Sequence, residues 1–186
     1  MRVNVRLAAM AFGLTALAGC SADGGENAAA PTTEAAKEAA GSSTLAEGLG
    51  DAKTFTAAVK AAGLDGTLGG PGPYTVLVPS DAAFAKLPAG AADALMKPEA
   101  RAELTGVLTY HVLPGTILAA DIGKAIDNGD GKALLATMAG GTITATREGN
   151  AIVLTDSAGT KATVTGAEEQ KSNGVIHRID SVLMPS

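Results

Sequence analysis

The two histidines of the chain, His111 and His177, are the side chains best suited to acid–base chemistry. An imidazole titrates near neutral pH and can act as a general base. Together with Ser80 and Asp180, either histidine would supply the residue types of a hydrolytic triad. No serine of the chain lies in a Gly-x-Ser-x-Gly turn, which exposes the nucleophile in many hydrolases. We therefore expect no catalytic residues and no enzymatic activity.

The spacing of possible metal ligands argues against a metal site. Zinc requires three or four His, Cys or carboxylate ligands at short spacing, whereas the two histidines are far apart in the sequence. Residues 127–132, Asp-Asn-Gly-Asp-Gly-Lys, are faintly similar to a calcium loop or a phosphate cradle. They lack both the alternating carboxylates with a closing Glu and the four-residue gap before Gly-Lys. A solvated turn is therefore predicted there, and no metal or cofactor is expected.

Apolar neighbours indicate that both histidines are structural. Period-two alternation along the last predicted strand places His177 on the same face as Val175 and Ile179. His111 follows Leu108 at the end of a predicted helix whose core-facing positions are apolar. A histidine on an apolar face is usually buried and hydrogen-bonded. We predict this state for both residues.

Cys20 is the only cysteine, and its surroundings predict a modification site. A cationic start precedes an apolar run at 7–17, which is typical of an export leader and too short to span a membrane. The sequence Leu-Ala-Gly-Cys at 17–20 resembles the bacterial lipobox, in which the cysteine is diacylated on sulfur and becomes the new N-terminus. Residues 1–19 are thus a predicted signal peptide, and the membrane is the predicted partner of the acylated Cys20.

Residues 20–41 are predicted to be a lipidated cysteine and a flexible tether. Beyond Cys20 they contain Ala, Gly, Glu, Thr and Ser but no large apolar side chain that could offset the entropy of ordering. Ser21 stands where an aspartate would, by analogy with enteric bacteria, favour retention in the inner membrane. The predicted location is the cell envelope, at the periplasmic face or on the outer surface of the outer membrane.

The composition leaves room for one exported domain with a core of small side chains. Hydrophobic residues make up 46% of the chain, but many are alanine and only 3% are aromatic. The formal net charge of the whole chain is −5. Removal of the leader takes away Arg2 and Arg6 and makes the net charge −7. Since the lysines are scattered singly, no basic patch for a nucleic acid is expected.

The predicted elements change from helical to extended along the domain at 42–186. Thr44 and Glu47 form a capping-box pattern, and Ser80 is placed to cap a later helix. The first half is predicted to contain a helix at 45–62, a loop at 66–73, a strand at 74–78, a short helix at 82–87 and a longer helix from Pro98. Period-two segments at 142–146, 151–155, 160–165 and 175–184 then predict an antiparallel sheet. This order indicates an α+β fold.

Three segments of the domain resemble the fasciclin-like domain family. The first, at 74–84, contains a strand closed by Pro79 and followed by Phe84. The second is the pair Tyr110-His111. The third, at 173–185, begins with Asn173-Gly174 and contains His177, and it is the most specific. In this order and spacing, they identify residues 42–186 as a bacterial fasciclin-like domain.

The resemblance implies a single α+β domain in which N-terminal helices pack on a C-terminal antiparallel wedge or sandwich. It also implies adhesion or binding to a surface protein, a polysaccharide or a matrix component, with Asp81 and Asp180 as contacts. Arg178 shares the outer face of the predicted last strand with Asp180 and is a further candidate contact. The Tyr110-His111 pair is implied to be a structural hydrogen-bond centre. The alternative function is a carrier for a carotenoid or another apolar small molecule.

Overall fold

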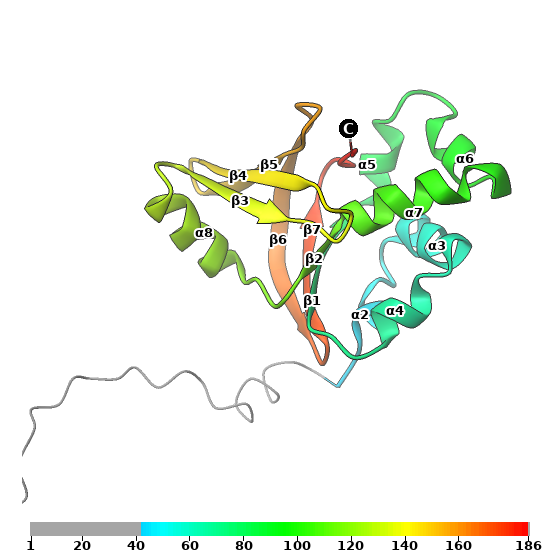
Figure 1. Cartoon of the computed structure of the whole chain (residues 1–186), viewed down its shortest axis with the longest axis horizontal. Helices are drawn as coiled ribbons and strands as arrows, with labels where there is room; N and C mark the ends of the chain where they lie inside the picture. The colour runs from blue at the N-terminus through cyan, green and yellow to red at the C-terminus, as the bar shows by residue number, and fades with distance from the viewer. Residues whose placement is uncertain (1–41, 186) are drawn as a thin grey trace, which may run out of the picture. The chain divides into compact units, whose positions relative to one another are not determined.

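The computed structural model describes residues 42–185 (Figure 1), so the predicted leader, Cys20 and the tether lie outside the described residues. The helices are α2 (Leu45–Gly48), α3 (Lys53–Ala62), α4 (Asp65–Gly69), α5 (Asp81–Ala85), α6 (Ala91–Leu95), the 3-10 turn η1 (Pro98–Ala100), α7 (Arg101–Tyr110) and α8 (Ala119–Asn128). The strands are β1 (Tyr74–Pro79), β2 (Val112–Pro114), β3 (Lys132–Ala136), β4 (Thr142–Glu148), β5 (Ala151–Thr155), β6 (Lys161–Lys171) and β7 (Gly174–Ile179).

The strands form one sheet in the order β2-β1-β7-β6-β5-β4-β3. All neighbours are antiparallel except β1 and β7, which run parallel from Tyr74 opposite Gly174 to Pro79 opposite Ile179. The α+β wedge expected from the sequence is confirmed, and the strands of the C-terminal half, β3 to β7, pair antiparallel as expected. The parallel pairing of β1 with β7 was not predicted. An apolar strand pattern does not specify the partner strand or its direction, and here the partner comes from the helical half of the chain.

The sheet bends in the middle of β6, its longest strand. The pairing of β6 with β7 shifts register between Thr165 and Glu169, and Gly166 within the shift has a positive φ of 72°. Such a bulge bends a strand and increases its twist. The bend separates the arm of β3, β4 and β5 from the arm of β1, β2 and β7, as Figure 1 shows.

Two apolar cores lie on opposite faces of β1 and β7. Residues Val76 and Ile176 pack with the helices α2, α3, α4 and α7 in the first core. Leu77 and Ile179 pack in the second core, which α8 shares with β3, β4 and β5. Because successive strand residues alternate between faces, both strands are buried on both sides. This double burial explains the continuous apolar run that marks β1 in the sequence.

The first predicted helix is interrupted, and the predicted loop after it contains a helix. A turn at 49–52 separates α2 from α3, and the carbonyl of Gly48 at the end of α2 accepts a hydrogen bond from Arg178 at 3.1 Å. Residues 66–69 of the predicted loop form α4 together with Asp65, and Leu68 of this helix is buried. The capping box at Thr44 is confirmed by its hydrogen bond to Glu47 at 2.7 Å.

The last strand ends at Ile179 and does not continue to Met184 as predicted. The backbone N–H groups of Leu183 and Met184 instead donate to the side chains of His111 and Asp156. The helix predicted to begin at Pro98 starts with the 3-10 turn η1 before α7. Sequence patterns did not reveal α6, β2 or α8.

Asn173 holds the turn before β7 against the first helices. Its Oδ1 accepts from the N–H of Leu45 at 2.8 Å, and its Nδ2 donates to the carbonyls of Leu68 at 2.8 Å and Gly70 at 2.7 Å. The next residue, Gly174, lies so close to the backbone of Tyr74 that a Cβ would not fit. The Asn-Gly motif is therefore required by packing between segments distant in the sequence.

We predict that Asn173→Ala lowers the free energy of unfolding by about 3 kcal/mol, because three partly buried backbone groups lose their partner. Urea denaturation of the purified variants measures this change. Asn173→Asp keeps the acceptor for Leu45 but loses both donors, so it should also be strongly destabilised. Ser172→Ala is the matched neighbour and should stay within about 0.5 kcal/mol of the wild type. Equal stability of all four proteins would contradict the assigned role.

Candidate functional site

Asp81, one of the three candidate contacts, is exposed. It begins α5, but its side chain caps a different helix, α3. Its Oδ1 accepts the backbone N–H of Thr54 at 2.9 Å, in the first turn of α3. The N-cap position of α3 is Ala52, which has no side-chain acceptor of its own. The hydrogen bonds from Thr54 hold the pKa of Asp81 below its usual value. Asp81 therefore supplies a helix cap between segments as well as an exposed carboxylate.

Asp180 joins β6, β7 and α5 at the end of the parallel strand pair. Its Oδ1 accepts the N–H of Thr163 at 2.7 Å, and its Oδ2 lies 3.2 Å from Nζ of Lys86. Burial would raise the pKa of this carboxyl, but the hydrogen bonds from Thr163 and Lys86 outweigh burial and lower it. Because Ser80 N–H donates to the carbonyl of Ile179, the residues that follow, Asp81 and Asp180, lie at the same end of the domain.

Arg178, the third candidate contact, pairs with Glu169 rather than with its strand neighbour Asp180. Its side chain is only 18% exposed, and its Nε donates to Glu169 at 3.0 Å. Burial would raise the pKa of Glu169, but the hydrogen bonds from Arg178 and Lys171 outweigh it and lower this pKa. The guanidinium also donates to the carbonyl of Gly48. Arg178 thus connects α2 with β6 and β7.

The buried ring of His111 has both nitrogens satisfied. Nδ1 lies 2.8 Å from the carbonyl of Val107, and Nε2 accepts the N–H of Leu183 at 3.2 Å. A carbonyl can only accept, so the proton belongs on Nδ1 and the ring is neutral. Phe55 packs edge-on against it, with ring centroids 6.2 Å apart. The predicted burial and hydrogen bonding of His111 are seen in the structure, and they leave no lone pair for catalysis.

His177 is equally buried, at 1% exposure, and lies between the strands and the loop before α8. Its Nε2 donates to the carbonyl of Ile117 at 2.8 Å, while its Nδ1 has no partner within the described residues. Ser80 accepts the N–H of Ala83 and caps α5, as predicted. Since Ser80, Asp180 and His111 each bond to other groups, the structure does not assemble the triad considered above.

Within residues 42–185, no group of three potential ligands could hold a metal ion. The segment 127–132 instead ends α8 and turns into β3, as expected for a solvated turn. Also within these residues, no helix is long and apolar enough to cross a membrane.

A small, partly open apolar cavity lies among α3, α5, α6 and α7. Its volume is about 20 Å³, and Phe55, Phe84, Met96, Leu108 and His111 are among its lining residues. Small-molecule sites usually have volumes of roughly 300–1,000 Å³, so this cavity has room for about one water molecule. A carotenoid would require the helices around it to separate.

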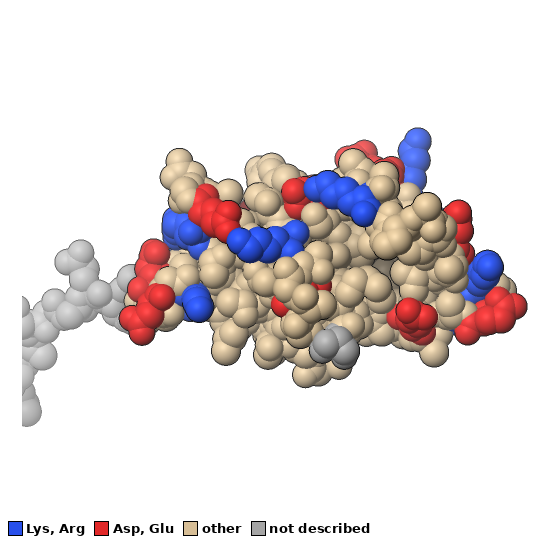
Figure 2. Space-filling model, turned by 90° about the horizontal axis from the view of Figure 1, so that it is seen from above, with Lys and Arg blue, Asp and Glu red and all other residues tan. Residues whose placement is uncertain are grey.

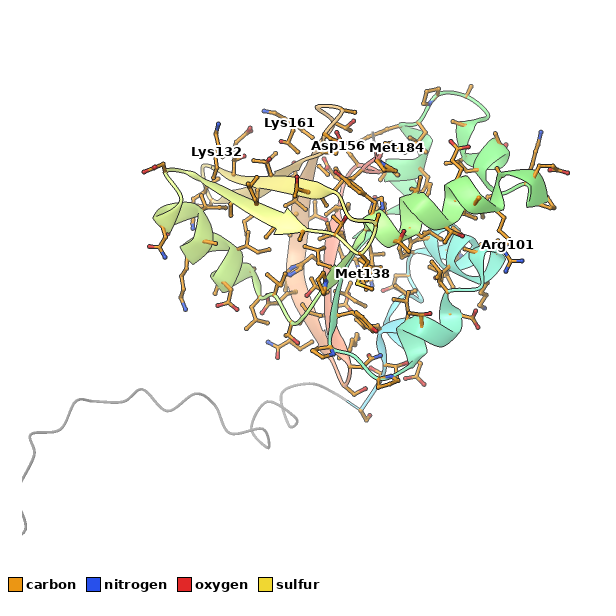
Figure 3. The ribbon with its side chains drawn as sticks, in the orientation of Figure 1. Arg101, Lys132, Met138, Asp156, Lys161 and Met184 are labelled. Carbon is orange, nitrogen blue, oxygen red and sulfur yellow. The ribbon has the colours of Figure 1, made fainter. Side chains whose placement is uncertain are left out.

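A larger open hollow, which sequence reasoning did not predict, lies where two turns and the C-terminal segment meet. Its volume is about 400 Å³, and it is lined by Tyr110, Ala139, Gly140, Gly141, Thr142, Ser157 and Pro185. The Tyr110 hydroxyl donates to the carbonyl of Thr142 at 2.9 Å, and Gly141 lies against the Tyr110 ring where a Cβ would clash. Figure 3 shows Asp156 and Met184, the neighbours in sequence of Ser157 and Pro185, at the top of the domain. No charged side chain lines the hollow.

Comparison with known proteins assigns the chain to a family. The Fasciclin domain pattern matches residues 50–185. Protein sll1483 of Synechocystis is 37% identical over 180 residues, covering 96% of this chain and 92% of the relative. Immunogenic protein MPB70 of Mycobacterium bovis is 34% identical over 114 residues, covering 61% of this chain and 51% of the relative. The chain belongs to the fasciclin domain family.

A solved structure supports the fold. It is the FAS1 domain pair from the insect cell adhesion molecule fasciclin I, with a TM-score of 0.54 and 21% identity. The match covers 72% of this chain and 45% of that chain. At this identity the likeness shows the fold alone, and it agrees with the α+β arrangement of residues 42–185.

We predict that His111 makes the domain less stable in mild acid. Burial, opposed by the hydrogen bond to Val107 and the charge of Asp156, lowers the pKa of His111 from 6.5 to about 4. The unfolded chain therefore takes up a proton that the folded state resists, and stability falls as the pH drops below 6.5 towards 4. Between pH 7 and pH 5, the loss from this residue should be about 2 kcal/mol.

The measurement is the difference in free energy of unfolding between the wild type and His111→Gln, followed by urea denaturation at several pH values. The glutamine amide keeps one donor and one acceptor but does not titrate. Its stability should change less than that of the wild type over this range. The carboxyls of Asp81, Glu169 and Asp180 contribute only at lower pH, because their usual values lie near 4. Identical pH dependence of both proteins would refute a neutral buried His111.

Proposed function

We propose that this protein is a lipid-anchored protein of the cell envelope whose fasciclin domain mediates adhesion, by binding a surface protein, a polysaccharide or a matrix component. The observation that carries this proposal is family membership over residues 50–185. The family includes the cell adhesion molecule fasciclin I, to which the fold is similar. The likeness to sll1483 covers 96% of this chain and so extends into the segment before the domain.

A binding role fits the way the polar side chains of the domain are used. His111, Asp180 and Ser80 bond to backbone groups or to other side chains, as a fold requires. A catalytic site would instead leave a nucleophile and a base free to meet a substrate. We therefore propose that the protein is not an enzyme and that its function depends on a partner.

The position where the chain enters the domain suits a tethered module. Ser172 N–H, in the turn between β6 and β7, donates to the carbonyl of Ser43 at 2.9 Å. In Figure 1 this entry lies at the bottom of the domain, whereas the C-terminal segment lies at the top. The turn between β5 and β6, whose residues 157–160 are exposed, lies at the end of the domain away from this entry (Figure 1).

The face seen in Figure 2 is not of the kind that binds nucleic acid. On the face in Figure 2, lysines and arginines alternate with acidic residues and are separated by wide uncharged areas. Phosphate recognition needs clustered positive charge. Asp81 and Asp180 remain proposed partner contacts, since their side chains are accessible as well as bonded within the domain. Arg178 is a weaker candidate, because its side chain is only 18% exposed.

Anchoring can be tested at Cys20. We predict that the wild type sediments with membranes and that Cys20→Ser moves the protein to the soluble fraction, because two or three acyl chains give firm attachment. Immunoblots of fractions from the native host, with mass spectrometry of the N-terminal peptide, measure this change. Ser21→Ala is the matched control and should remain with membranes. Membrane attachment of Cys20→Ser equal to that of wild type would contradict lipid anchoring.

Adhesion can be tested in the same host. We expect a deletion strain to lose most of its surface attachment and biofilm, and the wild-type gene to restore both. Cys20→Ser should not restore them, because a released domain no longer joins the cell to its partner. Crystal-violet staining and attachment under flow measure the effect. Unchanged attachment of the deletion strain would rule the adhesion function out.

A further inference from the structure

We infer that the hollow lined by Tyr110, Gly140, Gly141, Thr142 and Ser157 is a binding site for a neutral glycan. The inference rests on the proposed adhesion function, because it names the partner class that the domain would bind. The volume of about 400 Å³ lies within the range of small-molecule sites, unlike the small cavity among the helices.

The lining excludes charged and purely apolar ligands. Three of its side chains, Tyr110, Thr142 and Ser157, have hydroxyls, and none is charged. A charged ligand would lose its hydration without gaining an opposite charge, and an apolar ligand would desolvate the hydroxyls without replacing their hydrogen bonds. A neutral ligand with many hydroxyls satisfies both conditions.

The surrounding backbone argues against a peptide. Gly140 and Gly141 belong to the turn between β3 and β4, and Ser157 belongs to the turn between β5 and β6. A peptide that adds a strand needs an exposed strand edge, and a peptide helix needs an apolar groove. A hollow bounded by turns and hydroxyls offers neither. Gly140, where a Cβ would meet no atom within 4 Å, also lets a ligand approach the backbone closely.

The shape of the hollow is fixed by contacts within the fold. Tyr110 is buried and holds the carbonyl of Thr142, and its ring lies against Gly141. Asp156, itself buried, accepts the N–H of Thr160 at 2.7 Å and that of Met184 at 2.9 Å. These bonds hold the turn that contains Ser157 next to the C-terminal segment. The site is thus preorganised, which lowers the entropy cost of binding.

The test uses the full chain with Cys20→Ser, labelled with ¹⁵N and titrated with cellotetraose, maltotetraose and α-1,6-mannotetraose. We expect at least one of these glycans to shift the amide signals of Gly140, Gly141 and Ser157 in a saturable way. Tetragalacturonate and tetra-alanine represent a charged glycan and a peptide, and neither should shift these signals as strongly.

Variants at positions that are not buried separate the hollow from its surroundings. Ser157→Trp fills the hollow and should weaken binding at least tenfold. Thr142→Val removes one hydroxyl while preserving shape, and the loss should be about three- to tenfold. Thr144→Val makes the same change two residues further along β4, outside the hollow. This variant should bind like the wild type.

Each remaining outcome overturns the inference. These outcomes are no saturable shift with any of the three neutral glycans, shifts centred on other residues, or stronger binding of tetragalacturonate or tetra-alanine. Loss of attachment in the deletion strain without glycan binding would leave adhesion standing and remove the glycan site. Glycan binding with unchanged attachment of the deletion strain would leave the glycan site standing and remove the adhesion function.

Discussion

The parallel pairing of β1 with β7 is the interaction on which both halves of the domain depend. It joins a strand from the helical half to the last strand of the sheet, from Tyr74 opposite Gly174 to Pro79 opposite Ile179. The two strands form the wall between the cores, and all of their residues except Tyr74 and Arg178 are buried. A substitution there would affect both cores.

Polar contacts then join the starts of three helices to segments that are distant in the sequence. The N–H groups at the starts of α2, α3 and α8 are accepted by Asn173, Asp81 and Glu168, none of which lies in the helix it caps. Each bond satisfies a donor that a helix cannot pair internally and ties two segments together. Residues with the appearance of surface contacts, Asp81 above all, thereby acquire a structural role.

The sequence predicted those features that are encoded locally. The strand at 74–78, the cap at Ser80 and the burial of both histidines follow from neighbouring residues, and each agrees with the structure. The start of α8 was not predictable, because its N-cap is Leu118 and its acceptor comes from Glu168 on β6. The parallel direction of β1 and β7 was equally hidden, since it depends on pairing between distant segments.

The same reasoning explains why the predicted site residues were easier to find than the hollow. Asp81, Arg178 and Asp180 are charged residues next to recognisable motifs, and the structure shows all three bonded within the domain. The hollow is formed by small, uncharged turn residues from separate segments, which carry no sequence signal individually. The charged and titratable side chains of this domain hold its own elements together. The groups that remain available to a partner at its turns are therefore backbone groups and hydroxyls. Recognition by such groups favours uncharged partners, because hydrogen bonding rather than charge pairing then determines what binds.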